Sequence, residues 1–206
     1  MEVAPGIYRV QSGNEVIYAL ACGEGCYALI DVGSEPELPA KLEELGKDGI
    51  DPKHVGAVFI THFHHDHCGA LPRLRQQAPA RVVTHRLSVE KPSYCVAVPG
   101  IPKELVDYTV DDGDQVEIGN LALVVRHLPG HTPDSVAWQL GQDFFAFAYH
   151  YTISMLRRFF WNKRRMHASK DHLYIFRPIV VGQFISPRAG QRLKRNCHRV
   201  YIVFQV

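Results

Sequence analysis

Long apolar runs are missing from this 206-residue sequence. No stretch approaches the roughly 18 consecutive apolar residues of a membrane-spanning helix, and Met1-Glu2 does not open a basic, apolar secretory leader. We therefore expect a cytoplasmic protein without a membrane segment. Hydrophobic residues make up 46% of the chain and charged residues 21%, which is typical of globular domains and excludes wholesale disorder. The length suits one domain.

Cysteine is also scarce: the chain has five cysteines, an odd number, and they are scattered along the sequence. The closest pair, Cys22 and Cys26, has a wider spacing than the pair of a zinc knuckle. A disulfide framework is not expected. We interpret Cys22 and Cys26 as small buried core residues, because reduced cysteine is among the most buried residue types.

Acidic residues almost disappear after residue 148. Residues 1–148 contain 20 of the 21 acidic residues and 11 of the 23 basic ones, whereas residues 149–206 contain 12 basic residues and Asp171 alone. This boundary predicts a folded region at 1–148 and a basic C-terminal segment at 149–206. The segment has three interpretations: a solvated extension, a nucleic-acid-binding arm in which Arg157–Arg165 mixes basic and aromatic residues, or the product of a changed reading frame.

The first region is divided by turn residues into short apolar runs. Runs rich in Val, Ile, Tyr and Leu predict a meander of three strands, at 7–10, 16–21 and 27–31. Ser34–Glu37 then shows a capping-box pattern, and the leucines that follow it at 38, 42 and 45 share one helical face. The pattern predicts a helix after the three strands.

A strand–helix–strand pattern follows. Ala57–Ile60 predicts a buried strand, Gly69–Gln77 a short helix, and Arg81–Thr84 another strand, which together indicate an α/β crossover. Further strands are predicted at 121–126, 136–140 and 144–148, the last two as a hairpin. In the basic segment, 173–176, 179–181 and 200–204 also have strand character.

Residues with metal-ligating side chains follow the Ala57–Ile60 strand directly: His62, His64, His65, Asp66 and His67. Because residues i and i+2 of a strand point to one side, His62 and His64 are expected to meet at one ion while His65 points away. Asp66 and His67 would begin the next turn and serve a second ion. Imidazole and carboxylate suit zinc or iron, and catalytic zinc generally takes three protein ligands and leaves one position to water.

His131, at the exit of the 121–126 strand, is the best remaining third donor for the first ion. We interpret His54, His85 and His127 as surface or core residues, because a lone histidine is more often one of these than a ligand. Cys68 is interpreted as a residue that faces the core.

Two motifs carry a family resemblance. Thr61–Gly69, with the sequence THFHHDHCG, resembles the signature of the metallo-β-lactamase fold superfamily, and Leu128–Ser135, with LPGHTPDS, resembles its second metal segment. Tyr27–Gly33 resembles the third-strand segment of the family. The resemblance covers about residues 3 to 145 in the family's order. The short spacer around His131 looks most like that of glyoxalase II-type hydrolases.

The resemblance implies an α/β fold, the four-layer αββα sandwich, with metals at one end between two sheets. It implies that His62, His64 and His131 hold the first metal, while Asp66 and His67 bind a second. The implied function is that of a glyoxalase II-like hydrolase, in which a zinc-bound hydroxide, oriented by Asp66, attacks a thioester, lactone or similar ester. The partner is a small-molecule substrate. The cofactor is one zinc, or two if the second site is completed; iron is the alternative, because the family also includes iron-dependent persulfide dioxygenases.

The sequence departs from the family beyond residue 140. The family places a Gly-Asp pair, whose aspartate bridges the two metals, where this chain has Phe147 and Ala148. None of the later histidines, at 150, 167, 172 and 198, lies in a recognisable family context for the final ligand. An alternative function is therefore a catalytically impaired protein of this fold whose basic segment binds nucleic acid.

Overall fold

The computed structural model describes residues 1–89 and 100–141, together with the backbone of 143–147 and 199–203. The strands are β1 (Glu2–Ala4), β2 (Ile7–Ser12), β3 (Glu15–Ala21), β4 (Tyr27–Ile30), β5 (Val55–Phe59), β6 (Arg81–His85), β7 (Tyr108–Val110), β8 (Gln115–Ile118), β9 (Leu121–His127), β10 (Val136–Leu140), β11 (Asp143–Phe147) and β12 (Arg199–Val203). The helices are α1 (Leu38–Lys47), α2 (His65–Cys68) and α3 (Leu71–Leu74), with single 3-10 turns η1 (Pro52–His54), η2 (Arg86–Ser88) and η3 (Lys103–Leu105).

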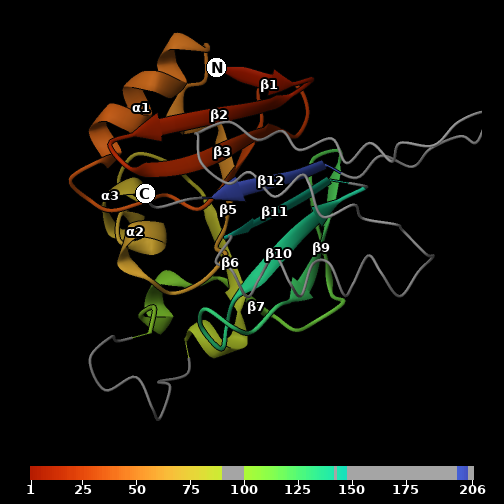
Figure 1. Ribbon diagram of the computed structural model, residues 1–206. Coiled ribbons are helices and arrows are strands. Elements are labelled where there is room, and N and C mark those ends of the chain that lie inside the picture. Colours follow the sequence, from red (N-terminus) through yellow and green to blue (C-terminus); the bar gives the residue numbers. More distant parts are fainter. Residues whose placement is uncertain (90–99, 142, 148–198, 204–206) are drawn as a thin grey trace, which may run out of the picture.

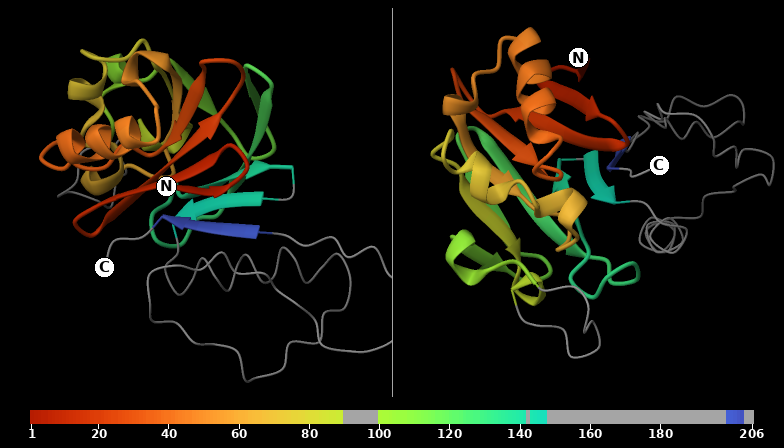
Figure 2. Two further views of the ribbon diagram at one scale, coloured as in Figure 1. Left: turned by 90° about the horizontal axis from the view of Figure 1, so that it is seen from above. Right: turned by 90° about the vertical axis from the view of Figure 1, so that its left-hand side faces the viewer.

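Two sheets and a layer of helices make up the described part of the chain. The first sheet has the order β1-β2-β3-β4-β5-β6-β7, antiparallel up to β4 and parallel from β4 to β7. The second has the order β12-β11-β10-β9-β8. Helices α1, α2 and α3 lie on one side of the first sheet, and the second sheet packs on its other side (Figures 1 and 2). These are three layers of the predicted αββα sandwich.

The alternation of side chains along the central strands explains the layers. In β4 and β5, Leu29 and Val58 join the core beneath the helices, whereas their neighbours Ile30 and Phe59 join the core between the two sheets. Successive strand residues point to opposite faces, so a strand that is apolar at every position can supply both cores. The second sheet adds Trp138, which is fully buried against Phe59 with ring centroids 4.9 Å apart.

Helix α1 forms where it is predicted, but its predicted capping box is absent. Glu37 is the N-cap residue and makes no side-chain cap hydrogen bond. Its carboxylate instead accepts a hydrogen bond from the hydroxyl of Ser12. The backbone N–H of Ser34 donates to Glu15 Oε2 at 2.8 Å. The pattern at Ser34–Glu37 therefore ties the start of the helix to the β2–β3 hairpin, which local sequence alone does not reveal.

The short helix predicted over Gly69–Gln77 is present as α3, which is shorter than predicted, and a separate helical turn that was not predicted, α2, precedes it. The break between α2 and α3 lies at Gly69 and Ala70, where the Ala70 N–H donates to the carbonyl of Gly33 at 2.9 Å. Proline at the start of α3, Pro72, lacks the N–H that would continue a longer helix. The chain between β5 and β6 is thereby folded back against the loop that follows β4.

Three parallel strands end at the same edge of the first sheet. Asp31 follows β4 directly, the segment Thr61–His67 follows β5, and His85 ends β6. The second sheet meets this edge through β10, because the Val136 N–H donates to the carbonyl of Thr61 at 2.9 Å. Ligand sites in α/β proteins lie at the carboxyl ends of the strands, and the polar cluster of the sequence lies at this edge.

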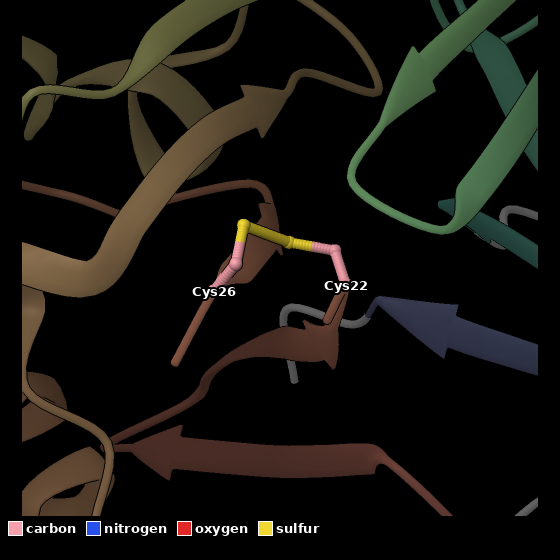
Figure 3. The surroundings of a disulfide bond; sticks show 2 residues. All are labelled: Cys22 and Cys26. Atoms are coloured by element: carbon pink, nitrogen blue, oxygen red, sulfur yellow. A yellow bond between two sulfur atoms is a disulfide. The ribbon is translucent and has the colours of Figure 1, made fainter. Parts of the chain in front are cut away.

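The opposite edge carries a disulfide, contrary to the expectation from the sequence. Cys22 and Cys26 face each other across the turn between β3 and β4 and are joined by a disulfide (Figure 3). The Cys22 N–H donates to the Cys26 carbonyl at 2.8 Å, and the Cα atoms are 5.2 Å apart, within the range that a disulfide requires. The interpretation as unpaired core residues is wrong. Their pairing depends on the hairpin, and their spacing resembles no known motif.

Within the described part of the chain, no helix is long and apolar enough to cross a membrane. Of the predicted basic segment, 149–206, only β12 is described; it pairs in parallel with β11 and matches the strand predicted at 200–204. The strands predicted at 173–176 and 179–181 lie outside the described residues. The division of the chain at residue 148 and nucleic-acid binding by this segment remain predictions.

Candidate metal centre

The histidine cluster lies in the loop and the short helix that follow β5. The strand ends at Phe59, so His62 and His64 belong to the loop and His65–Cys68 form α2. Strand alternation therefore cannot be what brings His62 and His64 to one side, and this part of the prediction is wrong. The structure nevertheless brings their rings within 4.8 Å of each other, centroid to centroid, and leaves His65 exposed. The loop turns the two side chains together.

Three histidines from distant parts of the chain meet at this point. Ligand nitrogens of His62, His64 and His131 all lie within 4.8 Å of one another. His131 comes from the loop between β9 and β10, and its Nε2 is 2.9 Å from Nδ1 of His64. Each pair of rings is close to perpendicular, with interplanar angles of 69° to 89°. Rings in this arrangement point nitrogens at a common centre and do not stack.

Burial keeps these three imidazoles neutral. Desolvation, followed by the charges of the neighbouring histidines, lowers the pKa of His62 well below its ordinary value. The same causes lower the pKa of His131 to about 4. Burial also lowers the pKa of His64, while the carboxylates of Asp66 and Asp134 oppose the shift. Each ring therefore keeps a lone pair at neutral pH, as a metal ligand must.

The three donors fit a zinc ion. Two nitrogens bound to a tetrahedral zinc stand about 3.4 Å apart, given bonds of about 2.1 Å. The separations between these nitrogens, from 2.9 Å to at most 4.8 Å, bracket that value. His62 is fully buried, whereas His64 and His131 are partly exposed. The centre therefore has a dry side and a side open to solvent. Among the described residues, these three form the only group of histidine, cysteine or acidic side chains with this geometry.

Asp66 and His67 lie next to the three histidines. The His67 ring centroid is 4.1 Å from that of His62, and its Nε2 is 3.1 Å from Oδ2 of Asp66. On its other nitrogen, Nδ1, His67 hydrogen bonds to Oδ2 of Asp31 at 2.7 Å. Burial would lower the pKa of His67, but the charge of Asp31 and the hydrogen bonds to both carboxylates outweigh it and raise the pKa to about 9. His67 is thus an imidazolium between two carboxylates.

The half-buried carboxyl of Asp66 stays ionised. Desolvation would raise the pKa of Asp66, but the hydrogen bond and the charge of His67 hold the pKa below its ordinary value. Asp66 and His67 therefore form an ion pair beside the centre. A second metal bound here would have to displace the proton of His67.

Asp31 is a further residue of the site, and it lies in the Tyr27–Gly33 segment that resembles the family. Its carboxylate is fully buried and accepts hydrogen bonds from the N–H and the hydroxyl of Thr61, both at 2.7 Å, in addition to the bond with His67. It is also the one non-glycine residue with positive φ, +59°, among those described. An acidic residue directly after a wholly apolar strand is the signal in the sequence that points to it.

Cys68 and the histidines at 54, 85 and 127 do not belong to the group of three donors. The Cys68 thiol donates to the carbonyls of Phe63 and His64, and burial raises its pKa to about 12, so it is not a thiolate ligand. His85 and His127 stack on each other, with centroids 4.2 Å apart, and burial lowers the pKa of His85 to about 4. His54 is exposed at the start of β5. Residue 148 and the later histidines, at 150, 167, 172 and 198, lie outside the described residues.

Comparisons with known proteins agree with this architecture. A model of the metallo-beta-lactamase superfamily matches residues 13–148. A hydroxyacylglutathione hydrolase from Methylobacterium sp. is 34% identical over 124 residues, which are 60% of this chain and 42% of that protein. The chain thus spans less than half of the length of this relative.

Two solved structures share the fold. A metallo-beta-lactamase from Cronobacter sakazakii superposes with a TM-score of 0.64 at 24% identity, covering 72% of this chain and 58% of the other. A metallo-beta-lactamase from Novosphingobium pentaromativorans superposes with a TM-score of 0.59 at 28% identity, covering 69% of this chain and 58% of the other. The family match spans both histidine loops and the strands that carry them, and the chain belongs to the metallo-beta-lactamase superfamily.

Proposed function

We propose that the protein is a metal-dependent hydrolase of thioesters, lactones or similar esters, with a hydroxyacylglutathione thioester as the first substrate to test. The observation that carries the proposal is the convergence of three neutral imidazoles, from His62, His64 and His131, on one partly open centre. The substrate class is supported by the relatives of about one third identity that are named hydroxyacylglutathione hydrolases.

His62, His64 and His131 would hold one zinc ion. When bound, such an ion acts as a Lewis acid that polarises a carbonyl oxygen and lowers the pKa of a water to about 7. The chain itself supplies the rest. Burial of His62 excludes water from one side of the centre, and the two partly exposed rings leave the other side open to a substrate.

Asp66 is the acid–base candidate. Its carboxylate is ionised, half buried and fixed by His67 at 3.1 Å, so it can accept a hydrogen bond from an attacking water and hold that water in one orientation. His67, fixed in turn by Asp31, keeps Asp66 in place. If a second ion binds, Asp66 and His67 are the residues that would hold it.

The test is hydrolysis by purified protein loaded with zinc. We expect thiol release from a hydroxyacylglutathione thioester, followed with a thiol reagent, and loss of activity in His131→Ala. His54→Ala is the matched control, because His54 is an exposed histidine at the far end of β5 and should retain full activity. Hydrolysis of a lactone but not of the thioester would correct the substrate, and hydrolysis of neither would contradict the proposal.

Iron is the other metal that the donor set accommodates. Recovery of iron instead of zinc, together with oxygen consumption in the presence of a persulfide, would identify an oxygenase and replace the hydrolase proposal. Elemental analysis before any reloading separates the two outcomes.

A further inference from the structure

A buried carboxylate joins the loop that carries His131 to the loop that carries His62 and His64, in addition to the hydrogen bond from the Val136 N–H to the Thr61 carbonyl. Asp134, three residues after His131, is fully buried, and its Oδ2 accepts a hydrogen bond from the backbone N–H of Phe63 at 2.9 Å. Phe63 lies between His62 and His64. The hydrogen bond therefore joins the segment that carries His62 and His64 to the segment that carries His131.

A third segment supports the same carboxylate. The hydroxyl of Ser88, in the η2 turn after β6, donates to Asp134 Oδ2 at 2.6 Å. The Ser88 hydroxyl accepts in turn from the hydroxyl of Thr84 at 2.7 Å, and both residues are fully buried. Each hydroxyl thus donates to the next group, Thr84 to Ser88 and Ser88 to Asp134. These two hydroxyls, which follow or belong to β6 of the first sheet, hold the Asp134 carboxylate in place, and the carboxylate in turn holds the Phe63 N–H.

The loop at Asp134 is itself stiff. The Thr132 N–H and hydroxyl both lie within hydrogen-bond distance of the Ser135 hydroxyl, at 3.1 and 2.7 Å, and the Leu128 N–H donates to the Ser135 carbonyl at 2.8 Å. A displacement of Asp134 therefore moves the whole loop and His131 with it. The contact between Asp134 and Phe63 therefore helps to set the position of His131 relative to His62 and His64.

We propose that Asp134, held by Ser88, is a positioning residue that sets the spacing of the three histidines and so determines the affinity of the centre for its metal. The inference rests on the proposed metal centre and adds a residue with no ligand role of its own. Groups that orient metal ligands from outside the first coordination sphere typically change metal affinity by about 10- to 100-fold.

The variants separate positioning from folding. Asp134→Ala removes the hydrogen bonds from Phe63 and Ser88, whereas Asp134→Asn keeps a carbonyl oxygen that can accept from both. We expect Asp134→Ala to weaken zinc binding by about 10- to 100-fold and to alter the visible spectrum of the cobalt-substituted protein. Asp134→Asn should stay within about threefold of the wild type, since it conserves the geometry. Leu45→Ala is the control, because Leu45 is fully buried in helix α1, so its loss destabilises the fold and leaves the centre intact.

Zinc affinity is measured by chelator competition at a temperature where every variant is folded. Wild-type affinity and an unchanged cobalt spectrum in Asp134→Ala would overturn the inference, as would an equal loss in Leu45→Ala. If Asp134→Ala does not fold, Ser88→Ala decides. It removes one hydrogen bond and should weaken zinc binding by about two- to tenfold; an unchanged affinity would overturn the inference.

A second readout needs no metal. The Phe63 amide of the metal-free protein should exchange with solvent at least about tenfold faster in Asp134→Ala than in Leu45→Ala, because only the first variant removes its acceptor. Absence of zinc binding in the wild type would refute the proposed function, and the exchange rate would still test the contact. Equal Phe63 exchange in the two variants would overturn the inference.

Discussion

Replacing Asp31 by alanine tests how the structure supports the centre. The carboxylate accepts three hydrogen bonds of 2.7 Å, two from Thr61 and one from His67, in a fully buried position. Removing one partner of a buried, hydrogen-bonded charge pair costs about 3–5 kcal/mol. The residue also has φ of +59°, where alanine is about 1 kcal/mol less favourable than asparagine or aspartate. We expect Asp31→Ala to lower the free energy of unfolding by about 4–6 kcal/mol.

Asp31→Asn is the matched variant. Asparagine tolerates positive φ and keeps an oxygen for Thr61, so its cost should be about 1–2 kcal/mol. Both variants remove the charge that raises the pKa of His67 to about 9, and that pKa should fall in both. Urea unfolding followed by circular dichroism measures the first quantity, and an NMR titration of the metal-free protein measures the second. A cost below about 1 kcal/mol for Asp31→Ala, or a His67 pKa that does not move, would refute the reasoning.

Two further predictions concern pH and the disulfide. The pKa of His67 is about 9 in the folded protein and about 6.5 in the unfolded one, so protonation of His67 stabilises the metal-free protein by about 3 kcal/mol below pH 6.5. This contribution is lost as the pH rises through 9. Urea unfolding across this pH range should show the loss in the wild type and not in His67→Asn. Reduction of the Cys22–Cys26 disulfide should lower the free energy of unfolding by about 2 kcal/mol at most, because the closed loop is short. Zinc content should stay unchanged, since the disulfide lies before β4 and the metal centre lies at the other end of that strand. Loss of zinc on reduction would show that the two ends of β4 are coupled.

Much of the fold is predictable from local patterns. The apolar runs at β2, β3, β4 and β5 are short and bounded by turn residues, so they indicate strands regardless of tertiary context. The hairpin of β10 and β11 follows from its central turn. Helix ends were harder to predict. The break between α2 and α3 depends on the hydrogen bond from Ala70 to Gly33, a contact between segments far apart in sequence.

The site shows the same division. The density of ligand-type residues at 62–67, and the motif around His131, point to the three histidines before any geometry is known. The supporting carboxylates are less visible, because Asp31 and Asp134 act through backbone N–H groups and hydroxyls of other loops. The Cys22–Cys26 disulfide depends on the pairing of β3 with β4 and has no recognisable spacing. Residues defined by partners distant in the chain are those that sequence reasoning missed.

The metal content of the purified protein tests the central claim most directly. Elemental analysis of wild type, His62→Ala, His131→Ala and the control His54→Ala should give about one zinc per chain in the wild type and the control, and almost none in the other two, because three ligands are the minimum for a catalytic zinc. Circular dichroism establishes that each variant is folded. A wild type without bound metal, or equal metal content in all four proteins, would contradict the account.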